Sequence, residues 1–142
     1  LRTVEITEND VDQPSDAVIA VLDELRSRGV TISIDDFGTG HSSLERLRTM
    51  HVDELKLDRA FVASLCVDER DRQIVQTIID LANRLGTSVV AEGVEHADQI
   101  DQLLAMGCHR GQGFHFSPAV DRASFDRMVA AAAHAASATR IT

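Results

Sequence analysis

The sequence contains no Trp and no Tyr, and it has only 5 Phe and 2 Cys. Without Trp and Tyr, we do not expect a platform on which the bases of single-stranded nucleic acid stack. Positive charges are also few, because 14 Lys and Arg face 23 Asp and Glu for a formal net charge of −9. This balance argues against a surface that binds DNA or RNA polymers, or one that lies on an anionic membrane. With 44% hydrophobic residues in 142, the composition favours one acidic globular domain.

Cysteines and long apolar runs are equally scarce. Cys66 and Cys108 lie far apart and form no CxxC motif, which is typical of a reduced, cytoplasmic protein. No apolar run approaches 18 residues, so we expect no membrane span in this segment, although a longer parent protein could be tethered elsewhere. The first residues have a strand pattern without an initiator Met or a signal peptide. Because a domain rarely begins inside a core strand, we expect the chain to be part of a larger fold.

Short apolar strands alternate with amphipathic helical patterns along the chain. The expected strands lie around residues 4–6, 30–34, 52–57, 88–91 and 108–116. The expected helices lie around residues 15–28, 42–47, 74–85, 100–107 and 121–129. Five βα units in a row predict an α/β fold with a parallel sheet and right-handed crossovers. A doubly wound sheet and part of a (β/α)8 barrel both fit this order.

Each expected strand ends in its own ionisable or amide side chain. These are Glu5, Asp35 with Asp36, Lys56 with Asp58, Glu92, and Gln112. The strand ends of a barrel converge on one mouth, whereas a doubly wound sheet spreads them along an edge and usually carries a Gly-rich phosphate loop. The sequence has neither GxGxxG nor GxxxxGK[ST]. The pattern favours a partial TIM-like barrel, and because a full barrel needs about 250 residues, the chain matches about its last five βα units.

The charges at these strand ends predict a metal site. Carboxylates of Glu5, Asp35, Asp36 and Glu92 would repel one another at one mouth unless cations compensate them. An all-oxygen ligand set suits Mg²⁺ or Mn²⁺ rather than Zn²⁺. One of the adjacent aspartates could bridge two ions, and two ions about 4 Å apart stabilise the attacking and leaving oxygens of a phosphoester displacement. Lys56 would lie near a metal-bound water molecule or a phosphate oxygen. Each residue alone could be a loop cap or a surface charge, so the hypothesis depends on the joint pattern.

Five segments resemble, in the same order, the motifs of EAL-domain cyclic-di-GMP phosphodiesterases. DDFGTGHSSL at 35–44 resembles the DDFGTGYSSL signature of that family. The segments at 5–8, 56–61, 92–95 and 111–118 resemble its ExTE, KIDxSF, EGVE and QGYxFSxP motifs. The resemblance implies a modified TIM barrel and hydrolysis of the bacterial second messenger cyclic-di-GMP to linear pGpG with Mg²⁺ or Mn²⁺.

The resemblance also implies roles for individual residues. Glu5, Asp35, Asp36 and Glu92 would be metal ligands, with Asp35 the bridge between two ions. Lys56 would orient the nucleophilic water, Glu92 would also act as the general base, and Gln112 would lie beside the metal and water cluster. Glu8 would hold the loop of residues 37–43. The implied loop and supporting residues are Glu8, Thr39, Gly40, Asp58 and Glu95.

The sequence also departs from the family pattern. It contains no Glu-Ala-Leu and lacks the segment that carries an Asn ligand in the family. His41 and Phe114 stand where the family usually has Tyr. We therefore expect the C-terminal portion of an EAL domain, with motifs in residues 1–118 and a terminal helix and Ala-rich tail in 119–142. From the isolated chain we expect little or no turnover.

Other interpretations remain open. The chain could belong to a non-catalytic cyclic-di-GMP receptor or to an EAL domain that only binds a partner protein. It could also be the remnant of a truncated gene. Sensory or cyclase domains could accompany it in a full-length protein. An open five-strand sheet would expose both edge strands, so we expect dimerisation or aggregation of the isolated chain.

Overall fold

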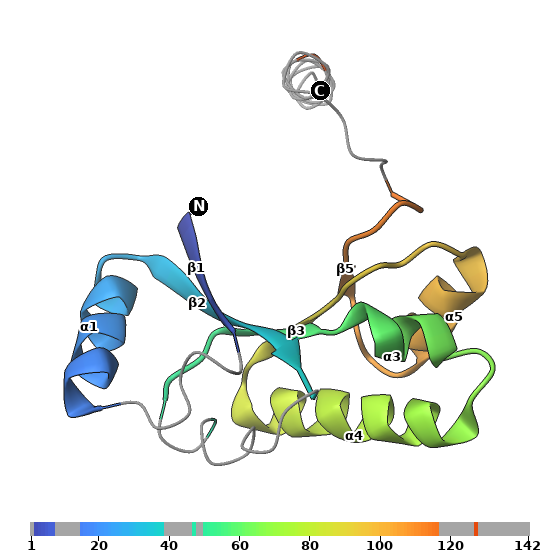
Figure 1. The fold of residues 1–142 in the computed structure, drawn as a ribbon, viewed down its shortest axis with the longest axis horizontal. Helices are drawn as coiled ribbons and strands as arrows, with labels where there is room; N and C mark the ends of the chain where they lie inside the picture. Colours follow the sequence, from blue (N-terminus) through green and yellow to red (C-terminus); the bar gives the residue numbers. More distant parts are fainter. Residues whose placement is uncertain (1, 8–14, 39–46, 48–49, 117–126, 128–142) are drawn as a thin grey trace, which may run out of the picture.

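The computed structural model describes residues 2–7, 15–38, 47, 50–116 and 127, and these form a curved parallel sheet with helices around it (Figure 1). The sheet has five strands in the spatial order β1-β2-β3-β4-β5. Their bounds are β1 (Arg2–Thr7), β2 (Val30–Phe37), β3 (Glu54–Leu57), β4 (Ser88–Ala91) and β5 (Arg110–Gly111). Each pair of neighbours is parallel. A doubly wound sheet reverses its direction of growth at a switch point. The described strands progress in one direction only, which confirms the predicted partial barrel.

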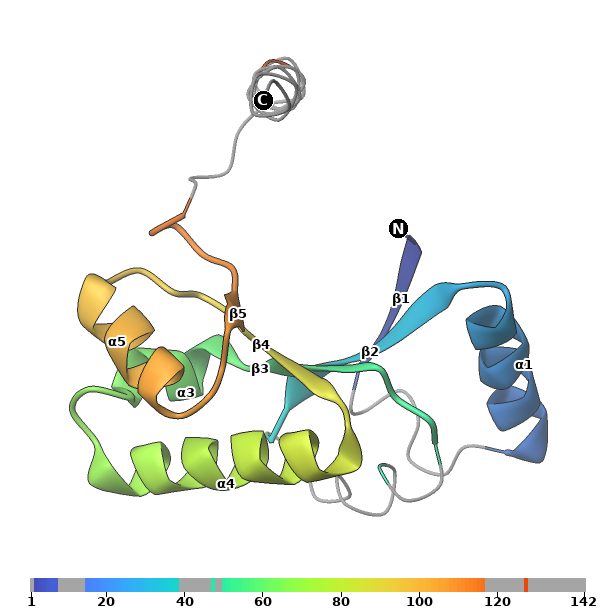
Figure 2. The same cartoon turned by 180° about the vertical axis from the view of Figure 1, so that it is seen from behind.

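Within the described residues, four helices lie outside this sheet (Figure 2). They are α1 (Asp16–Ser27), α3 (Arg59–Ser64), α4 (Glu69–Leu85) and α5 (Ala97–Ala105). Asp68 caps α4 by accepting from two backbone N–H groups of its first turn, and Gly86 ends it with φ 72°. The short helix α3 has no counterpart among the predicted elements. It forms because the Asp58 carboxylate accepts from the Ala60 N–H at 2.7 Å.

Two predicted helices lie mostly outside the described residues. The expected helix at 42–47 contributes only residue 47 to the described part, and the one at 121–129 contributes only residue 127. The boundary between residues 1–118 and 119–142 therefore stays a prediction. Among the helices that the structure describes, none combines the length and the apolar character needed to cross a membrane.

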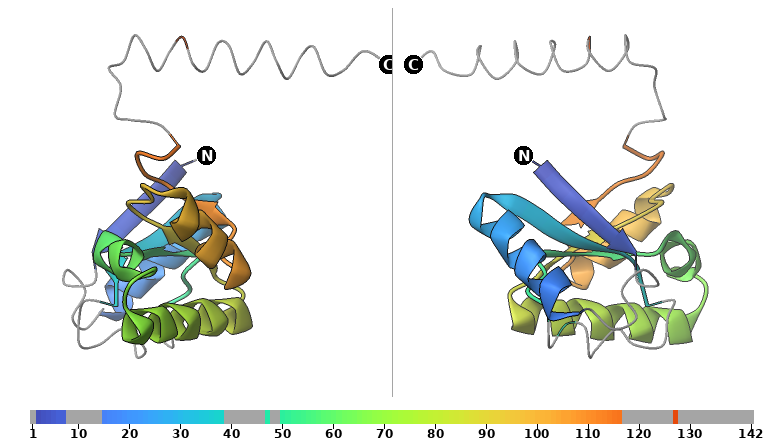
Figure 3. Two further views of the ribbon diagram at one scale, coloured as in Figure 1. Left: turned by 90° about the vertical axis from the view of Figure 1, so that its right-hand side faces the viewer. Right: turned by 60° about the vertical axis from the view of Figure 1, so that its left-hand side comes forward.

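The apolar core lies between the sheet and the helices. Leu55 and Leu57 point into a cluster that includes Val75 and Ile79 of α4, and all four are fully buried. Figure 3 shows α4 running along this side of the sheet. A smaller cluster joins Ile32 to α1. Because successive strand residues point to opposite faces, this packing leaves the alternate residues of each strand on the inner face, away from the helices.

Candidate active site

The inner face of the sheet carries polar side chains on neighbouring strands. Glu54 and Lys56 alternate with the buried Leu55 and Leu57 in β3, and their side chains pair with polar groups of the adjacent strands. On β2, Asp35 lies on the same face, with its carboxylate 3.1 Å from Lys56. The sequence therefore places the predicted site on the face opposite the helix core, at the carboxyl ends of the strands.

Lys56 lies at the centre of this group. Its side chain is only 8% exposed, and its Nζ lies 3.2 Å from Glu5, 3.1 Å from Asp35 and 2.7 Å from Glu92. These three acids come from β1, β2 and the residue after β4. Burial by itself lowers the pKa of Lys56, but the hydrogen bonds to the three carboxylates outweigh it and raise the pKa above its ordinary value. Lys56 is therefore a fixed cation that holds the ends of neighbouring strands together.

A local irregularity in β2 brings two consecutive aspartates into the same site. In a regular strand Asp35 and Asp36 would point to opposite faces. Here the β2–β3 register shifts between Ile34 and Phe37, and Asp36 takes a positive φ of 55°. Such a bulge re-aims a side chain. Carboxylate oxygens of Asp35, Asp36 and Glu92 all lie within 4.8 Å of one another, while Phe37 returns to the apolar core.

The electrostatics of this triad suit a divalent cation. Burial raises the pKa of Asp36, and the charge of Asp35, a hydrogen bond with Asp58 and the charge of Glu92 raise it further. Close carboxylates of this kind are relieved when a cation binds between them. The donors are all carboxylate oxygens, which Mg²⁺ and Mn²⁺ prefer. Asp35, Asp36 and Glu92 thus fit a hard divalent ion, and Glu5 reaches the same group through Lys56.

Glu92 and Gln112 connect the last two strands at the site. The Gln112 side-chain amide donates to Oε1 of Glu92, the same oxygen that accepts from Lys56. Both residues are anchored by their backbones, because Glu92 N–H donates to Leu57 and Gln112 N–H donates to Ala91. Two donors on one oxygen fix the orientation of the Glu92 carboxylate.

The structure brings most of the predicted site residues together. Glu5, Asp35, Asp36, Lys56, Glu92 and Gln112 form one connected group. Asp58 caps α3 and also contacts Asp36, while Glu95 is exposed at the rim. Glu8, Thr39 and Gly40 lie outside the described residues. The chemical roles assigned to all these residues stay predictions.

A cavity of about 590 Å³ opens beside Glu92 and Gln112. Arg59, Glu95 and Phe114 also line it, and Phe114 is 65% exposed. Arg59 was not predicted as a site residue, although its position directly after Asp58 placed it at the same strand end. A charged side chain and an aromatic ring therefore border the acidic group.

Other polar residues of the inner face were also missed. Ser33, Glu54 and Arg110 each stand two positions before a predicted site residue, namely Asp35, Lys56 and Gln112. The period of two along a strand is the signal that could have placed them on the same face.

Comparison with known proteins finds a match to the EAL domain family model over residues 2–119. The chain is 41% identical over 128 residues to the cyclic di-GMP phosphodiesterase NbdA of Pseudomonas aeruginosa, covering 90% of this chain and 16% of that protein. This chain thus spans about a sixth of the length of that relative.

Solved structures agree with this match. The EAL domain of Mycobacterium smegmatis DcpA has a TM-score of 0.84 and 41% identity, over 90% of this chain and 57% of that one. A manganese and cyclic-di-GMP complex of Klebsiella pneumoniae BlrP1 has a TM-score of 0.74 and 34% identity, over 81% of this chain and 30% of that one. The motif resemblance, the sheet order and the family match agree, and the chain belongs to the EAL domain family.

Proposed function

We propose that this chain supplies the larger part of a catalytic centre that hydrolyses cyclic-di-GMP to linear pGpG with two Mg²⁺ or Mn²⁺ ions. The observation that carries the proposal is the convergence of Lys56 with acids from three other strand ends, beside the Asp35–Asp36–Glu92 triad. Relatives named as cyclic di-GMP phosphodiesterases and the manganese complex of BlrP1 support the choice of substrate and metal.

The metal ligands in this proposal are Glu5, Asp35, Asp36 and Glu92. When bound, the two cations would lower the pKa of a water molecule and neutralise charge on the phosphodiester. Their positive charge also explains how a chain of net charge −9 can bind an anionic dinucleotide.

The chain's own groups then have distinct tasks. Lys56, held charged by its carboxylate partners, would exchange one of these hydrogen bonds for one to the attacking water or to a phosphate oxygen. Glu92 is oriented by Lys56 and Gln112, so one of its oxygens is available in a fixed direction to accept the proton of the water. The cavity bordered by Arg59 and Phe114 is the proposed place for the rest of the dinucleotide.

A direct test measures both metal binding and hydrolysis. Mn²⁺ binding to the 142-residue chain is followed by electron paramagnetic resonance, and pGpG release from cyclic-di-GMP is followed by liquid chromatography. We expect Mn²⁺ binding that Asp35→Asn weakens, and little or no pGpG from the chain alone. Any longer product of the same gene that supplies the Glu-Ala-Leu strand should release pGpG, and Glu92→Gln should slow it by about 100-fold or more.

The matched control is Glu24→Gln, which removes a carboxylate from an exposed ion pair on α1. It should change neither measurement. Absence of Mn²⁺ binding in both the 142-residue chain and the longer product would contradict the proposal.

The cavity beside Glu92 and Gln112 would also serve a second function, that of a cyclic-di-GMP receptor without catalysis. A protein that binds cyclic-di-GMP, never releases pGpG and is unaffected by Glu92→Gln would support the receptor. The free state of Cys66 and Cys108 fits the reducing cytoplasm as the proposed location for either function.

A further inference from the structure

A second polar group lies on the inner face of the sheet, one layer closer to the amino ends of the strands than the acidic site. It consists of Ser33, Glu54, Ser88 and Arg110, from β2, β3, β4 and β5. Arg110 Nη1 lies 2.7 Å from Oε2 of Glu54 and 3.1 Å from Oγ of Ser88. The hydroxyl of Ser33 donates to Oε1 of Glu54 at 3.3 Å. The Glu54 carboxylate therefore links β2, β3 and β5, and Arg110 extends the group to Ser88 of β4.

The burial of Glu54 makes its pairing energetically important, although the Arg110 side chain is 56% exposed. Ser33 is fully buried and Glu54 is 8% exposed. A buried carboxylate without a partner is strongly unfavourable, so Glu54 depends on the charge of Arg110. The Arg110 side chain also reaches across β4, because β4 lies between β3 and β5. It reaches toward the amino ends of the strands as well, since Glu54 is in register with Ser88 whereas Arg110 is in register with Val90.

Strand β5 needs such a connection because its backbone pairing is short. The strand has two residues, and its register partners in β4 are Val90 and Ala91 alone. Gln112 follows directly, and its side chain orients the Glu92 carboxylate. Gln112 stands two residues after Arg110, so the two side chains emerge on the same face. The Gln112 backbone is itself held by hydrogen bonds with Ala91 and Val94, and Arg110 adds to these bonds in fixing the place from which Gln112 reaches Glu92.

We propose that Glu54 and Arg110 are a positioning pair that holds β5 against the sheet and thereby aims Gln112 at Glu92. This inference rests on the proposed function for its catalytic consequence, but its structural part stands without it. Arg110 does not border the cavity beside the acidic site, so the pair acts through Gln112 rather than by touching the substrate.

Amide hydrogen exchange on the 142-residue chain tests the structural part. The Gln112 N–H donates to Ala91 and the Val94 N–H donates to Gln112, so both report on β5, while the Asp53 N–H donates to Ile32 and reports on β2 and β3. We expect Glu54→Gln and Arg110→Met to speed exchange at Gln112 and Val94 by about tenfold with no change at Asp53. Arg110→Lys, which keeps the charge, should restore most of the protection.

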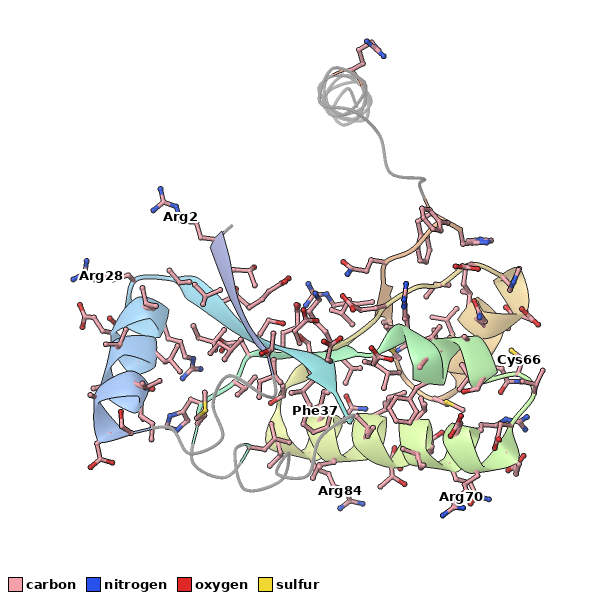
Figure 4. The ribbon with its side chains drawn as sticks, in the orientation of Figure 1. Arg2, Arg28, Phe37, Cys66, Arg70 and Arg84 are labelled. Carbon is pink, nitrogen blue, oxygen red and sulfur yellow. The ribbon has the colours of Figure 1, made fainter. Side chains whose placement is uncertain are left out.

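The matched control is Arg28→Met. Arg28 also pairs with a glutamate at 2.7 Å, but it lies on the exposed end of α1, far from β5 (Figure 4). This substitution should leave the Gln112 and Val94 amides unchanged. Unchanged exchange at Gln112 in Arg110→Met would overturn the inference, and so would an equal increase at Asp53, which would indicate general destabilisation.

Kinetics on a hydrolysing protein tests the catalytic consequence. Arg110→Met should lower kcat by about tenfold while KM for cyclic-di-GMP changes less than about twofold, because the binding cavity is left intact. A raised KM with unchanged kcat would instead make Arg110 a substrate-binding residue and overturn the positioning role. If Arg110→Met speeds exchange selectively at Gln112, but the protein neither hydrolyses cyclic-di-GMP nor binds metal, the proposed function is contradicted. The positioning role of the Glu54–Arg110 pair is still supported in that case.

Discussion

The chain at Gly113 passes directly against the Val94 backbone, and adding one methyl group there should displace the segment that follows Glu92. A Cβ atom on Gly113 would lie 2.3 Å from both N and O of Val94, which are backbone atoms that no side-chain rotation can move. Contact at this distance requires a shift of about 1 Å, since ordinary Cβ contacts are longer than 3.4 Å. Val94 is fully buried and follows Glu92 by two residues, so the shift should reach the Glu92 carboxylate.

The size of the effect follows from the contacts around Gly113. The Val94 N–H donates to Gln112 at 3.0 Å, and the His115 N–H donates to Val94 at 3.0 Å, on either side of the glycine. Overpacking of a tight contact costs about 1–3 kcal/mol, and each weakened hydrogen bond adds about 1 kcal/mol. With two such hydrogen bonds, we therefore expect Gly113→Ala to destabilise this region by about 3–5 kcal/mol.

Gly111→Ala is the matched control, because its Cβ would meet no atom closer than 3.4 Å. Urea unfolding monitored by circular dichroism, together with amide exchange at Val94 and His115, measures both variants. Gly113→Ala should lower the unfolding midpoint or, if the segment detaches locally, expose those two amides. Gly111→Ala should stay within about 0.5 kcal/mol of the original chain. Equal behaviour of the two variants in both measurements would refute the reasoning.

Three further predictions concern charge and association. Lys56→Met should destabilise the chain by about 3 kcal/mol in urea unfolding at pH 7, because it leaves the charges of the surrounding carboxylates uncompensated. Millimolar Mn²⁺ should recover part of this lost stability. A loss of stability that Mn²⁺ does not change would contradict the metal site. The hydrogen bond from Arg26 lowers the pKa of Asp53, so the unfolded chain binds more protons and this stabilisation, full above about pH 5, disappears as the pH falls below about 4. Because the Arg26–Asp53 pair is about one-third exposed, Asp53→Asn should lower the free energy of unfolding at pH 7 by about 1–2 kcal/mol. The same substitution should make the free energy of unfolding depend less steeply on pH in acid. An unchanged pH dependence in acid would argue against this role of Asp53. Finally, the edge strands β1 and β5 should make the chain associate as its concentration rises in gel filtration, and a monomer at every concentration would contradict this.

The sequence predicts the sheet and its faces well because strand alternation is a local property. Leu55 and Leu57 had to be buried once Glu54 and Lys56 faced the other way, and Gly86 had to end α4. The convergence of strand-end side chains then follows from the barrel arrangement of the parallel strands. For this reason the sequence alone indicates which side chains gather at the barrel mouth.

The parts that could not be predicted depend on contacts between distant residues. The bulge at Asp36 arises from the register between β2 and β3, which no local pattern records. The Glu54–Arg110 pair joins residues from strands that are not neighbours. Helix α3 is too short for an amphipathic period to be visible, so only its Asp58 cap could have indicated it.

The order of the site residues along the chain has a consequence for how the site assembles during synthesis. Glu5, Asp35 and Asp36 leave the ribosome before Lys56, and Glu92 and Gln112 follow later. The nascent chain therefore accumulates three negative charges before their internal cation exists. A chain interrupted before Gln112 would carry every acid of the site without the amide that orients Glu92. This group of side chains is therefore complete only when β5 emerges, and β5 is the described strand with the shortest backbone pairing. Because domains generally fold as units during synthesis, the group should form late.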